Sequence, residues 1–173
     1  MRKHIALPAA LTSLVGASLT AADLEVRVEI PRMNVAEYHR PYVAMWIERE
    51  DQSFVGNLAV WYDLQTNKNE KGTTWLKDLR QWWRKSGREL TLPIDGVSGA
   101  TRPPGAQVAA FRGNRAPLSN LAPGSYRLVV EAVREVGGRE LLRIPFQWPT
   151  PASASAKAQG QTELGQVQLN IKP

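Results

Sequence analysis

The residue types and spacing best suited to chemistry fall in one run, residues 95–101 (DGVSGAT), followed by Arg102-Pro103-Pro104-Gly105. Two glycines, one Asp and two hydroxyl residues make this run too glycine-rich for a helix and too poor in branched residues for a strand. The composition predicts a shaped turn that presents a side chain. Thr101 follows the small residues Gly99 and Ala100, so its hydroxyl is the group best placed to enter the active site of another enzyme and act there as a nucleophile.

The rest of the chain has few residues of the types that usually carry catalysis. There is no Cys, no phosphate-binding loop and no close carboxylate pair, and His39 is the only histidine beyond the N-terminal segment. A nucleophile–base relay or a metal site needs more of these side chains than the chain supplies. We therefore predict no catalytic residue and no metal ligand, and we interpret His39 as a surface or structural residue.

The run at residues 95–101 resembles the flavinylation motif read by the periplasmic FAD:protein FMN transferase. That motif has an Asp, a hydroxyl residue, Gly, Ala and a final Thr or Ser in this order, and it also marks FMN-carrying subunits of sodium-pumping quinone reductases and related FMN-binding domains. The positions that match are Asp95, Gly96, Ser98, Gly99, Ala100 and Thr101. The resemblance implies FMN joined to Thr101 through a phosphoester, and it implies nothing about the fold. Arg102-Pro103 departs from the more neutral continuation of the motif.

The loop also suggests how a phosphate ester would be held. Gly96 and Gly99 could let successive backbone N–H groups point outward as an anion-binding nest, and Ser98 could add a hydrogen bond. Pro103 and Pro104 would stiffen the exit of the loop and limit the entropy lost on docking.

Cationic and aromatic residues nearby could complete a flavin site. Guanidinium and ammonium groups suit a phosphate or an electron-rich reduced flavin, and the candidates are Arg80, Arg84, Lys85, Arg88 and Arg102. Trp75, Leu79 and Trp82 are expected to form the core stripe of a helix. Trp83 and Arg84 are therefore the better candidates for contact with the isoalloxazine ring.

A wider resemblance covers most of the chain. Residues 34–43, 57–62, 75–83 and 138–148 resemble a predicted periplasmic bacterial family, a domain of unknown function linked to PepSY-type membrane reductases and to the FMN transferase. The likeness implies a redox partner at the inner membrane, either a PepSY-type or a haem protein. It supplies no activity of its own.

The N-terminus predicts export. A basic start is followed by an apolar stretch and by small residues, which is the order of a secretory signal, and the stretch is too short for a permanent anchor. We expect residues 1–22 to be this signal and residues 23–173 to form one domain in the periplasm. The formal charge of +6 includes Arg2 and Lys3, so the expected mature chain carries only +4, which does not favour nucleic acid as a partner. No later segment approaches the length of a membrane span.

Apolar residues alternate with polar ones in several stretches, which predicts an all-β fold. The strands are expected at residues 24–30, 42–48, 54–62, 107–111, 125–136, 139–148 and 164–171. Residues 75–85 have helical spacing and predict a short amphipathic helix of about three turns. Gly137-Gly138 predicts a two-residue hairpin, and residues 149–160 a mobile loop. Together these favour an immunoglobulin-like β-sandwich of about seven strands with one inserted helix, and a partly open barrel is the alternative.

Two functional readings follow from these features. The first is a periplasmic flavoprotein electron carrier, with FMN on Thr101, that exchanges electrons with a membrane reductase and has no catalytic residues of its own. The second is a non-redox periplasmic binding or accessory module of a membrane complex. A hydrolase or other enzyme with its own active site is a weaker third.

Overall fold

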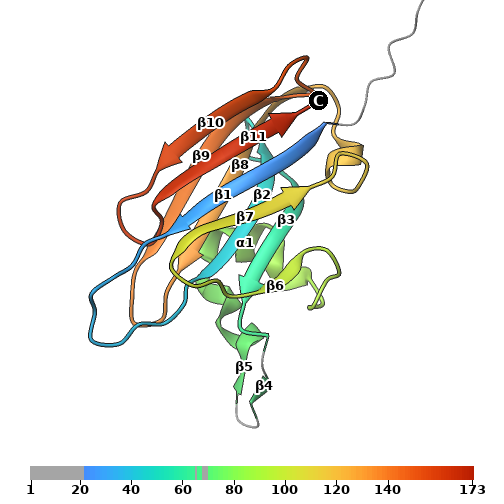
Figure 1. Cartoon of the computed structure of the whole chain (residues 1–173). Helices are drawn as coiled ribbons and strands as arrows, with labels where there is room; N and C mark the ends of the chain where they lie inside the picture. Colours follow the sequence, from blue (N-terminus) through green and yellow to red (C-terminus); the bar gives the residue numbers. More distant parts are fainter. Residues whose placement is uncertain (1–21, 65, 68–69) are drawn as a thin grey trace, which may run out of the picture.

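The computed structural model describes residues 22–64, 66–67 and 70–173 and shows two facing β-sheets (Figure 1). One sheet has the strand order β10-β11-β1-β7, and the other has the order β6-β3-β2-β8-β9. The strands of the first sheet are β1 Asp23–Ile30, β7 Gly105–Phe111, β10 Ala154–Gln159 and β11 Gln166–Lys172. Those of the second are β2 Tyr42–Arg49, β3 Phe54–Tyr62, β6 Ser98–Ala100, β8 Gly124–Val133 and β9 Arg139–Trp148.

The alternation of side chains explains the main core. In β1, every second residue from Leu24 to Ile30 is buried, while Arg27 and Glu29 face outward. A strand buries one face in this way when it covers one side of a sandwich. β2 is different because Val43 to Glu48 are all buried. It lies inside a sheet that is covered on both faces.

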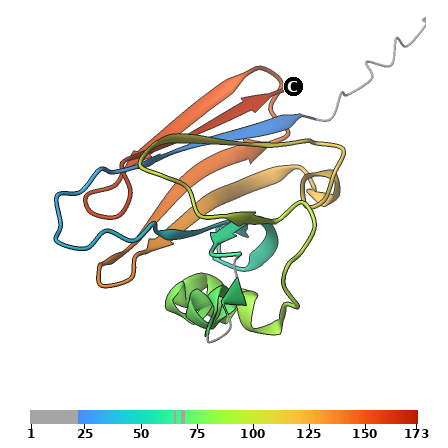
Figure 2. The same cartoon turned by 60° about the horizontal axis from the view of Figure 1, so that its bottom comes forward.

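A helical layer covers the outer face of the five-stranded sheet (Figure 2). It consists of the 3-10 helices η1 Gly72–Asp78 and η2 Gly87–Glu89 and the helix α1 Arg80–Lys85. Leu76, Leu79 and Trp82 from this layer pack on Trp46 and Val129 of the sheet in a second core. Short pieces elsewhere are β4 Thr66–Asn67, β5 Glu70–Lys71 and η3 Leu118–Asn120.

The expectation of one regular three-turn helix was wrong. The carboxylate of Glu131, which is fully buried in β8, accepts hydrogen bonds from the backbone N–H groups of Gln81 (3.1 Å) and Trp82 (2.8 Å). The carboxylate thereby satisfies two of the free N–H groups in the first turn of α1, so that an α-helix begins at Arg80 after η1 ends. Trp75 lies on η1 and is 39% exposed, so it is not part of the core stripe.

Three further expectations needed correction. The two sheets contain nine strands within the described residues rather than about seven. Residues 154–159 form β10 instead of a loop because their backbone pairs with β11, and such a ladder does not require apolar side chains. The hairpin between β8 and β9 uses the five residues 134–138, with Val136 at φ 52°, instead of a two-residue turn.

The β-sandwich itself is confirmed, with strands in two separate sheets. Residues 1–21, which hold most of the expected signal, lie outside the described residues, and β1 begins at Asp23. In the described ranges, no helix combines the length and apolar character needed to span a membrane.

Candidate functional site

The loop that carries residues 95–101 ends in a strand, not in a free turn. Ser98 to Ala100 form β6, which pairs in parallel with β3 at the edge of the five-stranded sheet. A Cβ on Gly99 would lie 3.2 Å from Cδ1 of Trp61. A glycine here lets the loop backbone approach the indole closely. Backbone pairing with β3, including the Val60 N–H to the Val97 carbonyl at 2.8 Å, then holds β6 in place.

The first half of the loop is a hydrogen-bonded turn. Ser98 Oγ accepts a hydrogen bond from the Ile94 N–H at 2.9 Å, while the N–H groups of Val97 and Ser98 donate to the Ile94 carbonyl. Gly96 has φ +72°, which glycine adopts without strain. Because these N–H groups point back into the turn, the outward-facing nest expected from the sequence is wrong. Ser98 shapes the turn.

Thr101 is held by its backbone. Its N–H donates to the carbonyl of Tyr62 at 3.2 Å, and its hydroxyl has no hydrogen-bond partner among the described residues. The next residue, Arg102, places its guanidinium 5.3 Å from the centre of the Trp61 ring. Such a cation–π contact anchors the exit of the loop. Thr101 is therefore a half-buried residue with a fixed main chain and an available hydroxyl.

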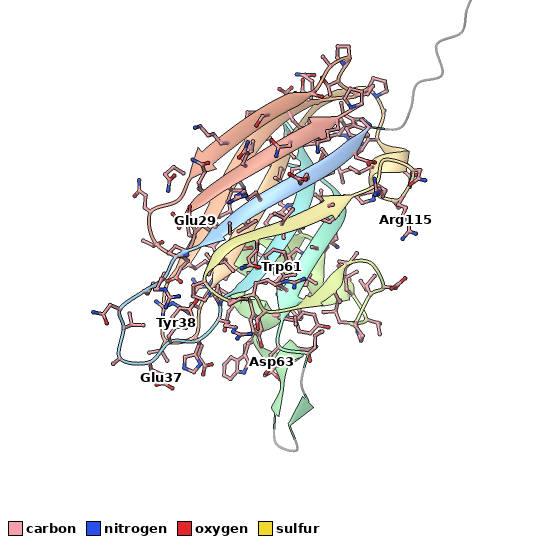
Figure 3. All side chains as sticks on the ribbon, in the orientation of Figure 1. Glu29, Glu37, Tyr38, Trp61, Asp63 and Arg115 are labelled. Carbon is pink, nitrogen blue, oxygen red and sulfur yellow. The ribbon has the colours of Figure 1, made fainter. Side chains whose placement is uncertain are left out.

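Thr101 lines a hollow of about 840 Å³, which we call the Thr101 hollow. Its walls come from the loop between β1 and β2, the β8–β9 hairpin, the helical layer and the end of β3. They consist of residues 38–40, Tyr42, Asp63, Trp75, Asp78, Arg80, Thr101 and residues 133–139. Figure 3 shows Tyr38 and Asp63 at the same end of the sandwich. The volume is in the range of about 300–1,000 Å³ typical of small-molecule sites.

The loop between β1 and β2 contributes two buried polar atoms that lack hydrogen bonds among the described residues, Tyr38 Oη and His39 Nε2. His39 Nε2 lies 3.0 Å from Glu37 Oε1 and Nδ1 lies 3.4 Å from Glu135 Oε2, which are ion-pair distances, but the approach of Glu37 does not give hydrogen-bond geometry. Burial raises the pKa of Tyr38, and the nearby Arg134 only partly opposes this. The phenol is thus neutral near neutral pH and can donate a hydrogen bond.

Four arginines give the Thr101 hollow its cations. Arg134 pairs with the buried Glu163 at 3.0 Å, and Arg139 pairs with Glu131 at 2.5 Å. Arg40 and Arg80 pair with no carboxylate in the part of the chain that the structure describes. These two guanidinium groups remain available to an anionic ligand.

The other candidate residues lie elsewhere. Asp95, Gly96 and Ser98 line a second hollow of about 730 Å³ beside Tyr62 and Leu92, here called the Asp95 hollow. Trp83 and Arg84 line a third of about 410 Å³ with Lys77, Arg80 and Arg139, here called the Trp83 hollow. The structure thus does not bring Trp83 or Arg84 into the hollow that Thr101 lines. The Thr101 hollow instead contains the aromatic residues Tyr38, Tyr42 and Trp75, none of which was proposed from the sequence as a flavin contact. Tyr38 and Tyr42 flank the short run His39-Arg40-Pro41.

Glu140 orders the loop that carries Glu163, and it provides a test of this end of the sandwich. Burial raises the pKa of Glu140, but hydrogen bonds from the N–H groups of Gln161, Leu164 and Thr162 outweigh it, so the pKa lies below its ordinary value of 4.5. A lowered folded-state pKa means that the carboxylate stabilises the fold above pH 4.5 and that this contribution is lost as the pH falls through the folded-state pKa.

We therefore expect Glu140→Gln to lower the thermal unfolding temperature near neutral pH and to have a smaller effect at about pH 3. The measurement is thermal unfolding by circular dichroism at both pH values, with Glu50→Gln, on an exposed turn, as control. An equal loss at both pH values would contradict a role for the ionised carboxylate.

The fold and the site define a β-sandwich domain with a hollow at one end, lined by Thr101 together with aromatic and charged side chains. Among the described residues, no group of three or more His, Asp or Glu side chains is arranged to hold a metal ion. The chain belongs to the family described as "Predicted periplasmic protein (DUF2271)", whose family model matches residues 23–166. No curated protein and no solved structure matches the chain.

Proposed function

We propose that the protein is a periplasmic flavoprotein electron carrier, with FMN attached to Thr101 through a phosphoester. The observation that carries this proposal is the position of Thr101. The hydroxyl that ends the flavinylation-like run belongs to a residue lining a hollow of about 840 Å³. The residues of this hollow fit FMN, since they combine aromatic rings, available guanidinium groups and buried polar atoms without partners.

The attachment would be carried out by an FAD:protein FMN transferase. The Thr101 oxygen attacks the phosphorus atom on the FMN side of the FAD pyrophosphate. A new O–P bond forms, the P–O bond of the pyrophosphate breaks, AMP leaves, and the hydroxyl proton passes to a base of the transferase. The chain contributes a presented hydroxyl whose backbone is held on β3 by the Thr101 N–H and the Arg102–Trp61 contact.

Bound FMN would supply reversible one- and two-electron chemistry. The residues of this chain would bind the flavin, limit its exposure to water and set the charge around it. The family's predicted periplasmic location supports exchange with a membrane reductase of the PepSY or haem type.

The test is the intact mass of the full chain after export in bacterial cells that also express the transferase. We expect a gain of one FMN less one water and a yellow protein, with no gain when the transferase is omitted. An unchanged mass, in cells where a known substrate domain is modified, would contradict the proposal. That result would instead favour a non-redox accessory module that uses the same hollow for a free ligand.

A further inference from the structure

We infer that the Thr101 hollow is the seat of the isoalloxazine ring, with the rings of Tyr38, Tyr42 and Trp75 as its aromatic wall. The inference rests on the proposed attachment only for the tether that brings the ring to this end of the sandwich. It goes further because it assigns ring contacts to residues that lie far from residues 95–101 in the sequence.

The three hollows differ in what they offer a flat heteroaromatic ring. The Thr101 hollow is the largest of the three and carries several aromatic side chains. The Asp95 hollow has a volume of about 730 Å³, but Tyr62 is its only aromatic residue and is 2% exposed. The Trp83 hollow has one indole and about 410 Å³, and Thr101 does not line it. A ring tethered at Thr101 therefore has its best aromatic surface in the Thr101 hollow.

The aromatic wall combines a ring held by protein contacts with a ring that is partly exposed. Tyr42 contacts Tyr62 edge-on, with ring centroids 6.4 Å apart, and its hydroxyl donates to the Gly72 carbonyl at 3.1 Å. Trp75 is 39% exposed, which leaves much of a large apolar ring uncovered. Binding of a ligand ring against this exposed indole would bury apolar surface, which lowers the free energy of the complex. Lys77 lies 5.9 Å from the centre of the same indole and extends the cationic surroundings.

The polar atoms of the loop between β1 and β2 point to the same ligand class. A buried donor without an acceptor is unfavourable, and the Tyr38 phenol, whose Oη is buried, has no hydrogen-bond partner among the described residues. His39 Nε2 is also buried without a hydrogen bond in good geometry, although it lies 3.0 Å from Glu37 Oε1. The edge of an isoalloxazine ring carries carbonyl oxygens and ring nitrogens that accept hydrogen bonds. In the proposed seat, the ring edge accepts a hydrogen bond from the Tyr38 phenol. Arg40 and Arg80 would oppose the negative charge of the reduced flavin.

Flavin fluorescence in two matched tryptophan variants tests the seat. Indole and phenol rings in contact with flavin quench its fluorescence, so the flavinylated full chain should be several-fold dimmer when folded than after denaturation. Trp75→Ala should recover several-fold fluorescence in the folded protein. Trp83→Ala is the matched control, because it removes an indole from the Trp83 hollow and should change nothing. The covalent mass gain should be the same in all three proteins.

A second variant, Tyr38→Ala, and a second ligand, free riboflavin, test the ring seat independently of Trp75→Ala. Tyr38→Ala lies in a loop rather than in a core and should also raise the fluorescence, while thermal unfolding checks that each variant is folded. Riboflavin added to the unmodified chain should bind to wild type and to Trp83→Ala, and more weakly to Trp75→Ala.

The outcomes separate the two proposals. A mass gain with fluorescence that responds to Trp83→Ala, or to neither tryptophan, overturns the ring seat and leaves the attachment standing. No mass gain, with riboflavin binding that depends on Trp75, overturns the attachment and supports the seat. No mass gain and no riboflavin binding overturns both.

Discussion

Thr101→Ala is expected to abolish covalent FMN completely. The change removes the only hydroxyl of the loop that lines the Thr101 hollow, and alanine has no oxygen with which to form the phosphoester. The fold should persist, because the contact that holds this residue is its backbone N–H to the Tyr62 carbonyl, which alanine keeps. The measurement is intact mass after coexpression with the transferase, together with thermal unfolding.

Two variants serve as controls for this result. Thr101→Ser keeps a hydroxyl at the same position and should still gain the mass of one FMN less one water. Ser98→Ala removes the acceptor of the Ile94 N–H, so it should loosen the turn and slow modification without moving its site. An unchanged mass gain in Thr101→Ala, with the flavin mapped to a peptide that holds Ser98, would contradict the assignment.

Glu131→Ala should be the most destabilising of the substitutions considered, by about 3 kcal/mol. The Glu131 carboxylate is fully buried, and its removal leaves the Gln81 and Trp82 N–H groups and the Arg139 guanidinium without their acceptor. Arg139 is about one third exposed and regains water, so most of the cost lies in the two backbone groups. We expect the midpoint of thermal unfolding to fall by roughly 10 °C.

The chain offers a graded series for this prediction. Glu131→Gln keeps one oxygen acceptor but loses the charge, so it should fall between wild type and Glu131→Ala. Glu50→Ala lies on an exposed turn and should have almost no effect. If Glu131→Ala unfolded at the wild-type temperature, the link between β8 and the helical layer would not be a major source of stability. A loss of Trp82 burial, seen as a red shift of tryptophan fluorescence, would support the detachment of α1.

This anchoring also matters for the Thr101 hollow. Arg139, which pairs with Glu131, and Arg80, which begins α1, both line that hollow. The same buried carboxylate therefore stabilises the helical layer and fixes part of the hollow's cationic wall. We expect Glu131→Ala to weaken riboflavin binding as well as stability.

The sequence by itself determined most of the strand pattern, including β1, β2, β3, β8 and β9. Residues 139–148 form β9 over the expected range because alternation of apolar and polar side chains reports directly which face is buried. It also singled out residues 95–101, since small residues and hydroxyls at fixed spacing are a local property. The sequence did not predict strand β10, because β10 is stabilised by pairing with β11 and its own alanines and polar residues show no strand pattern.

Only the tertiary structure decided the surroundings of Thr101. Its hollow joins loops after β1 and β8 with the helical layer, and no local pattern reports which of these segments meet. Trp75 and Trp83 both fit an amphipathic pattern, yet a buried carboxylate on a distant strand restarts the helix between them and places them in different hollows. Local patterns therefore predicted most of the strands and proposed Thr101 as a candidate residue, whereas the neighbours of Thr101 depend on contacts between residues far apart in the chain.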